Sequence, residues 1–126
     1  MLDNQKPQIF CTTEHWLRSL EIDIYNLHNY KLVSSFSREI TKGGGVAIYA
    51  QNEVNINSVS SSVSAIEKHF EYSIAKMFLN NHKTIIICIY RSPDGSLQVF
   101  EEKLTDILEG FRLSLIHISE PTRRTP

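Results

Sequence analysis

The sequence lacks the features that mark several large classes of protein. It contains no run of about 18 apolar residues, which is the length a helix needs to cross a bilayer. Its first residues, 1–6, have neither the basic start nor the apolar core of a secretory signal peptide. We therefore expect an intracellular protein that does not associate with a membrane.

Cysteine is scarce, with only Cys11 and Cys88 among 126 residues. Both stand inside apolar, strand-like runs, and no Cys-x-x-Cys pair is present to indicate zinc. Cysteines in such settings are usually small buried hydrophobic residues and not halves of a disulfide or ligands of a metal. We expect two buried thiols without a cross-link.

An excess of basic residues is also missing, because the formal net charge is −1. Proteins that bind nucleic acid usually have a basic surface, so the composition argues mildly against such a partner. Any contact with DNA would have to come from a local cluster of basic residues.

The length of the chain is enough for one domain and not for two.

Short apolar and β-branched runs dominate the chain and predict strands. The strands are expected at 9–13 (buried), 30–36, 46–50, 70–79 and 84–90, and the last two are expected to pair as an antiparallel hairpin through residues 80–83. Residues 51–65 predict a loop with a short extended piece. One apolar face predicts a helix over about 97–110. This order indicates an α/β class of the α+β type and excludes a regular Rossmann alternation.

The last 14 residues, Leu113–Pro126, differ from the rest of the chain. They show no continuing helical or strand period and end in a polar segment bounded by proline. They resemble the translated read-through of a sequencing-library adapter, and such additions are excluded from fold reasoning. We expect a domain over residues 1–112 and a non-native tail over 113–126 that makes few packed contacts.

Three features suggest chemistry, although each has an ordinary structural explanation when taken alone. Glu14 follows a strand, where a carboxylate is solvent-facing, paired with a basic group or bound to a metal. Tyr90 ends the most apolar strand, and its hydroxyl could reach a cleft while Arg91 meets a phosphate. Gly43–Gly45 precede a strand and lack the Gly-Lys-Ser/Thr of a phosphate-binding loop, which indicates a turn with close backbone approach.

The ordered set of motifs is more specific than its members. It consists of Thr-Glu-His-Trp-Leu at 13–17, Gly-Gly-Val-Ala-Ile-Tyr at 44–49, Phe-Glu at 70–71, Ile-Tyr-Arg-Ser-Pro at 89–93, and then Phe100 and Leu104 on a helix. This series resembles the DNase I-like endonuclease/exonuclease/phosphatase superfamily. Within it, the apurinic-type endonucleases of non-LTR retrotransposons are the most similar.

The resemblance implies a partial four-layer sandwich of mainly antiparallel sheets flanked by helices. It also implies hydrolysis of phosphodiesters with Mg²⁺ or Mn²⁺. Glu14 matches the metal-ligating glutamate of the family, and Tyr90 matches the tyrosine beside the scissile phosphate. Arg91, Lys42 and Arg38 are the expected contacts to DNA.

The chain also departs from the family pattern. The proline at 93 stands one place later than in the family. The asparagine of the family's first strand, the Gly-Asp-x-Asn segment and the closing Ser-Asp-His segment are all absent. We therefore expect a fragment whose natural sequence extends before Met1 and beyond Arg112. The metal is then incompletely coordinated, and the chain alone is not expected to cut DNA.

The resemblance points to a parent protein that nicks genomic DNA in the nucleus. The nick leaves a 3′ hydroxyl that primes a reverse transcriptase located downstream in the same polyprotein. One alternative is a non-catalytic remnant, or a domesticated fragment that binds a partner. A lesser alternative is a phosphatase on the same fold, in which Lys42, Arg38 and Arg91 meet a phosphorylated headgroup.

Overall fold

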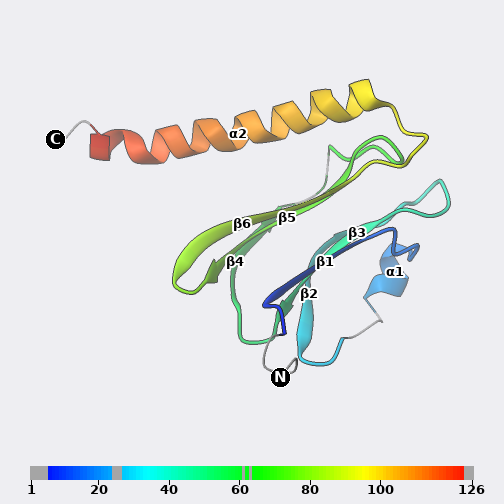
Figure 1. The fold of residues 1–126 in the computed structure, drawn as a ribbon, viewed down its shortest axis with the longest axis horizontal. Coiled ribbons are helices and arrows are strands. Elements are labelled where there is room, and N and C mark those ends of the chain that lie inside the picture. The colour runs from blue at the N-terminus through cyan, green and yellow to red at the C-terminus, as the bar shows by residue number, and fades with distance from the viewer. Residues whose placement is uncertain (1–5, 24–26, 61, 63, 124–126) are drawn as a thin grey trace.

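The computed structural model describes residues 6–23, 27–60, 62 and 64–123, with side chains as far as Leu113. Two three-stranded antiparallel sheets form its centre (Figure 1). The first sheet contains β1 (Ile9–Thr13), β2 (Tyr30–Phe36) and β3 (Val46–Gln51) in the order β1-β3-β2. The second contains β4 (Asn55–Ser60), β5 (Glu71–Leu79) and β6 (His82–Tyr90) in the order β4-β5-β6.

The hairpin predicted between the last two strands is confirmed. Leu79 pairs with His82, which leaves a two-residue turn of Asn80 and Asn81. Both asparagines have positive φ, at 52° and 67°. Two-residue hairpins need this left-handed backbone, and asparagine tolerates it better than other residues with a side chain.

The sheets pack face to face around one apolar core. Its buried residues come from both sheets and are Val46, Ile48, Ala50, Val54, Ala75, Met77 and Cys88. A hydrogen bond between the hydroxyls of Ser34 and Ser73 also crosses from β2 to β5. The core therefore lies between the sheets, as a sandwich requires.

Helices cover the outer faces of the two sheets. The short helix α1 (Ser19–Ile22) brings Ile22 against Ala47 and Tyr49 on the first sheet. The long helix α2 (Leu97–Arg123) runs along the second sheet, where Phe100 packs on Phe70 with ring centroids 5.7 Å apart (Figure 1). The layers are helix, sheet, sheet and helix, which confirms the α+β class and is consistent with a partial sandwich. None of the helices in the described part of the chain has the length and hydropathy that a membrane crossing requires.

Three expectations about individual elements need correction. The first strand is not buried: β1 lies at the edge of its sheet with one neighbour, and Phe10 is 42% exposed. The buried strand of that sheet is β3. Residues 55–60 form a full strand because they pair with β5. Cys88 is buried as expected, but Cys11 is exposed at the sheet edge.

The helix also extends further than predicted. Its backbone continues from the expected end near residue 110 to Arg123, through most of the predicted tail. Residues 111–120 contain no proline, so the backbone hydrogen bonds of the helix can continue through them, and Pro121 follows only in the last turn. The side chains from residue 114 onward, on which the tail prediction depends, lie outside the described part.

Candidate active site

Glu14 and Tyr90 lie side by side although they come from different sheets. Glu14 directly follows β1 and Tyr90 ends β6, and these two edge strands contact each other across the sandwich. The pKa of Tyr90 is raised, first because burial disfavours the phenolate and also because the Glu14 carboxylate lies within hydrogen-bonding reach. The hydroxyl of Ser92 and the charge of Arg38 oppose this shift. The Glu14 side chain is exposed and has no ion-pair partner among the described residues.

The backbone around Glu14 adopts a rare conformation. Glu14 and Trp16 have φ values of 56° and 62°, in the left-handed region that side chains disfavour. The N–H of Glu14 donates to the carbonyl of Gly45 at 2.7 Å, and that of Trp16 donates to Gly44 at 2.9 Å. These bonds fix where the Glu14 carboxylate emerges, and backbone strain of this kind often accompanies functional sites.

The three glycines leave room for side chains of the site. Gly43, Gly44 and Gly45 all have positive φ. A Cβ on Gly44 would lie 2.1 Å from Nε of Arg38, and one on Gly45 would lie 2.3 Å from Cε1 of His15. The turn and close approach inferred from the sequence are therefore both present. The glycines meet protein groups here and do not form a phosphate cradle.

His15 supports the loop and does not face a ligand. Its Nε2 bonds the carbonyl of Phe36 at 3.1 Å, while its Nδ1 accepts the N–H of Leu17 at 2.9 Å. This pattern requires the neutral tautomer with the proton on Nε2. The pKa of His15 is lowered because burial disfavours the charged ring, which agrees with a neutral structural histidine.

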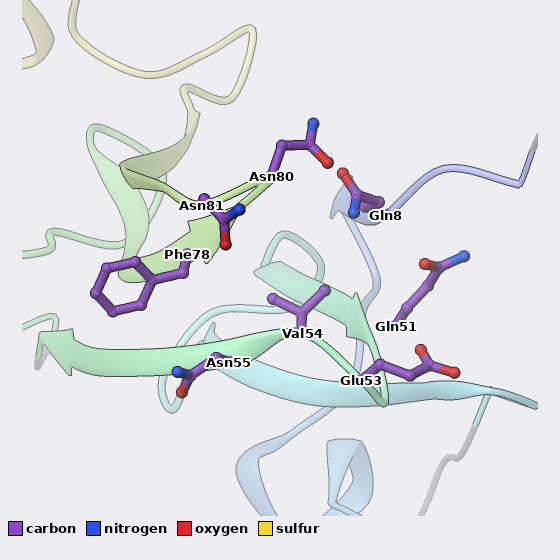
Figure 2. A pocket seen from close by; sticks show the side chains of 8 residues that line it. All are labelled: Gln8, Gln51, Glu53, Val54, Asn55, Phe78, Asn80 and Asn81. Carbon is purple, nitrogen blue, oxygen red and sulfur yellow. The ribbon is translucent and has the colours of Figure 1, made fainter.

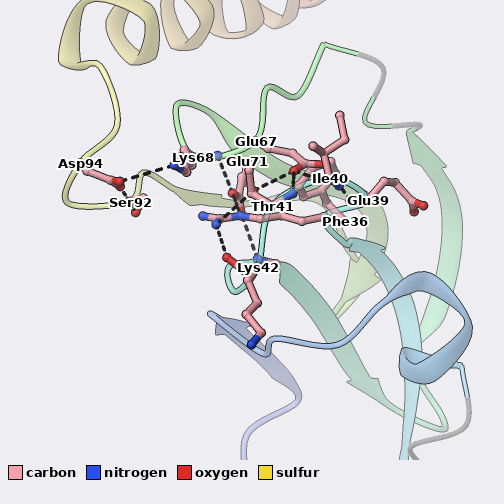
Figure 3. Close-up of polar contacts among 12 residues, drawn as sticks. Phe36, Glu39, Ile40, Thr41, Lys42, Glu67, Lys68, Glu71, Ser92 and Asp94 are labelled. Carbon is pink, nitrogen blue, oxygen red and sulfur yellow. Dashed lines mark hydrogen bonds and ion pairs between the residues drawn. The ribbon is translucent and has the colours of Figure 1, made fainter.

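Arg38 must be withdrawn from the predicted DNA contacts because it is buried, with 4% exposure. Its Nε donates to the Glu71 carboxylate at 2.5 Å, and a terminal nitrogen donates to the carbonyl of Lys42 at 2.8 Å. Glu71 is fully buried and also accepts the backbone N–H groups of Gly45 at 2.7 Å and Lys68 at 2.8 Å (Figure 3). The pair joins the glycine loop to β5, beneath the candidate site.

The other two predicted DNA contacts, Arg91 and Lys42, differ in how exposed their side chains are. Arg91 is half-buried, and one terminal nitrogen donates to the carbonyl of Gly95 at 2.9 Å, within its own loop. Lys42 is exposed, and its side chain points away from the buried cluster around Glu71 (Figure 3). Lys42 is therefore the most accessible of the three predicted contacts.

Sequence reasoning assigned no role to Glu71 or Glu67, which both organise this region. The signal for Glu71 was its place next to Phe70 in an apolar run, because a carboxylate there needs internal partners. Glu67 accepts the N–H groups of Glu39 at 2.6 Å, Ile40 at 3.0 Å and Thr41 at 2.7 Å (Figure 3). Nothing in the local sequence signals this contact, since the loops are far apart along the chain.

The Glu67 contact leads to a pH-dependent prediction. Burial raises the pKa of Glu67, but the N–H groups and the hydroxyl of Thr41 outweigh it and hold the pKa at about 2, below the ordinary 4.5. A depressed pKa in the folded state stabilises the protein above pH 4.5, and this contribution is lost as the pH falls towards 2. Glu67→Gln should cost about 2 kcal/mol near pH 7, a figure reduced for solvent screening.

Urea unfolding at several pH values measures this effect. The difference between wild type and Glu67→Gln should shrink as the pH falls from 4.5 towards 2. Glu109→Gln is the matched control, because Glu109 pairs with Arg112 on the exposed surface of α2. Such exposed pairs contribute little, so Glu109→Gln should leave the free energy of unfolding close to that of wild type at every pH. Equal effects of the two variants would contradict the role given to Glu67.

The described residues do not by themselves form a complete metal site. They contain no group of three His, Cys, Asp or Glu side chains that could hold an ion. At the candidate site Glu14 supplies one carboxylate, and Mg²⁺ held by one carboxylate keeps most of its water. We therefore assign no hydrolytic step through a metal to this chain.

A hollow in the surface lies at the end of β3 that is opposite to the candidate site. It has a volume of about 540 Å³ and is lined mainly by amide side chains: Gln8, Gln51, Asn55, Asn80 and Asn81 (Figure 2). Glu53, an exposed carboxylate, also lines it. None of the residues predicted to carry chemistry is there, so this end provides matched controls for the candidate site.

Comparison of the chain with protein-family models, curated proteins and solved structures finds no match.

Proposed function

We propose that this chain is part of a metal-dependent phosphodiesterase of the endonuclease/exonuclease/phosphatase type. The observation that carries the proposal is the meeting of Glu14 and Tyr90 at adjoining edges of two sheets. The helix-sheet-sheet-helix layering adds support, because it is the arrangement that the motif series implies. In this proposal Glu14 is one ligand of Mg²⁺ or Mn²⁺, and Tyr90 lies beside the scissile phosphate.

The particular function that we propose for the parent protein is nicking of target DNA in the nucleus. The 3′ hydroxyl at the nick then primes a reverse transcriptase in the same polyprotein. Lys42 is the main proposed phosphate contact. Arg91 is a weaker candidate because it already donates a hydrogen bond to the carbonyl of Gly95 in its own loop. The order and wording of the motifs support this retroelement assignment.

Binding of Mn²⁺ tests the proposed role of Glu14. Millimolar Mn²⁺ should broaden the backbone amide NMR signals of residues 13–16 and 89–91, because the ion is paramagnetic and Glu14 is exposed beside Tyr90. Glu14→Gln should weaken this binding about tenfold or more, since the amide cannot replace the carboxylate charge. Tyr90→Phe should leave the broadening in place, because the phenol is not a proposed ligand.

Glu53→Gln is the matched control for this titration. It makes the same change on an exposed carboxylate at the other end of the sandwich, within the hollow of Figure 2. Broadening that survives Glu14→Gln, or that centres on residue 53, would contradict the proposal and favour a non-catalytic remnant. In a plasmid-nicking assay with Mg²⁺ or Mn²⁺ the chain alone should be inactive. Nicking that Glu14→Ala abolishes would overturn the expectation of inactivity.

A further inference from the structure

The two cysteines meet at the open edges of the two sheets. Cys11 lies in β1 and Cys88 lies in β6, which are the edge strands that contact each other across the sandwich. The Cys88 thiol lies 3.8 Å from the carbonyl oxygen of Thr12, and it also lies within hydrogen-bonding reach of the Cys11 thiol. The sequence predicted two unrelated buried thiols, but the fold places them in contact.

The two thiols differ in accessibility and acidity. Cys11 is exposed, whereas Cys88 is 6% exposed. The neighbouring Cys88 thiol lowers the pKa of Cys11 to about 7, against the opposing effect of burial. The neighbouring Cys11 thiol, together with burial, raises the pKa of Cys88. An accessible thiol that is partly ionised at neutral pH is the one that reacts first with an oxidant.

We propose that Cys11 and Cys88 form an oxidative modification site, which a small-molecule disulfide such as glutathione disulfide converts into an intrachain disulfide between the sheets. The Cys11 thiolate attacks one sulfur of glutathione disulfide, forms a mixed disulfide and releases one glutathione thiolate. The sulfur of Cys88 then attacks the Cys11 sulfur and releases the second glutathione, which takes up the proton of Cys88. The cysteines lose two electrons and two protons, and glutathione disulfide is reduced to two thiols.

The position of the site gives the cross-link a structural consequence. Cys11 precedes Glu14 by three residues and Cys88 precedes Tyr90 by two, so the disulfide ties the sheets together next to the candidate active site. It closes most of the chain into a loop and restricts the unfolded state. The inference rests on the thiols alone and does not require the proposed phosphodiesterase function.

Mass spectrometry of the full chain tests the proposal. The reduced protein is incubated with glutathione disulfide, the remaining thiols are alkylated, and the intact mass and peptide map are recorded. The expected product is about 2 Da lighter than the reduced chain, has neither thiol alkylated, and yields a peptide joining residues 11 and 88. Its melting temperature should rise by roughly 10 °C, and dithiothreitol should reverse the change.

Two variants separate the steps. Cys88→Ala should stop at a glutathione adduct on Cys11, because no second thiol can resolve it. Cys11→Ser should not react, because Cys88 is buried. Circular dichroism checks that both variants fold. The proposal would be overturned if wild type stopped at the adduct or formed a disulfide between two chains. It would also be overturned if the Cys11→Ser variant reacted as well as wild type. None of these outcomes affects the Mn²⁺ experiment.

Discussion

Replacing Glu71 by glutamine should destabilise the protein by about 3–5 kcal/mol, which is the range for breaking a buried ion pair. Glu71 is fully buried, and one carboxylate oxygen receives both Arg38 Nε and the N–H of Lys68 while the other receives the N–H of Gly45. Glutamine has only one acceptor oxygen, so its NH₂ group must face a donor. The Arg38 charge would remain buried without its partner. Since small domains are stable by about 5–15 kcal/mol, this loss removes much of the folded population at physiological temperature.

Urea unfolding followed by far-UV circular dichroism measures this cost. Asp94→Asn is the matched control, because it makes the same acid-to-amide change in the exposed Lys68–Asp94 ion pair, where nitrogen and oxygen are 3.7 Å apart. That control should leave the free energy of unfolding close to that of wild type, because solvent screens an exposed ion pair. The double variant Arg38→Met with Glu71→Gln should cost less than the two single changes added together, because it leaves no unpaired buried charge. A Glu71→Gln effect as small as the Asp94→Asn effect would show that the buried pair does not hold the sheets together.

Replacing Gly45 by alanine should destabilise the fold by about 3 kcal/mol or more. Two costs combine, namely a backbone conformation that alanine disfavours and a side chain that has no space. The φ of Gly45 is +96°, and the new Cβ would lie 2.3 Å from the ring of His15. That ring cannot easily move because both its nitrogens are hydrogen-bonded. Because the Gly45 carbonyl accepts the N–H of Glu14, the change should also displace the proposed metal ligand.

Gly110→Ala is a control that should change the stability of the protein in the opposite direction. Gly110 lies in α2, and a Cβ there would meet nothing within 4 Å. Alanine is favoured over glycine inside a helix, so this change should stabilise the protein by about 0.5–1 kcal/mol. Adding His15→Ala to Gly45→Ala should relieve the clash but not the backbone strain, leaving part of the cost. If Gly45→Ala unfolded at the same urea concentration as wild type, the close packing of the loop on His15 would be disproved.

Local patterns in the sequence were enough to predict most strands and the beginning of the long helix. Asn80 and Asn81 predict the β5–β6 turn because the turn needs two positive φ values and asparagine tolerates them. The apolar period after Ser96 indicates the face of α2 that covers β5 and β6. The motif order predicted one shared site for Glu14 and Tyr90, and residue spacing alone could not have predicted that they lie close together.

The sequence by itself determined which segments extend, where they turn and which faces are apolar, because these properties depend on residues within a few positions of one another. Only the tertiary structure decided which polar residues are available to a ligand. The neighbours of Arg38 in the sequence predict an exposed arginine. In the structure, an ion pair with Glu71 from a distant strand keeps it buried. Cys11 is exposed because its strand lies at a sheet edge, and it meets Cys88 because two such edges adjoin. Strand order and sheet packing are set by contacts between distant residues, so they leave no local signal from which these two outcomes could be read.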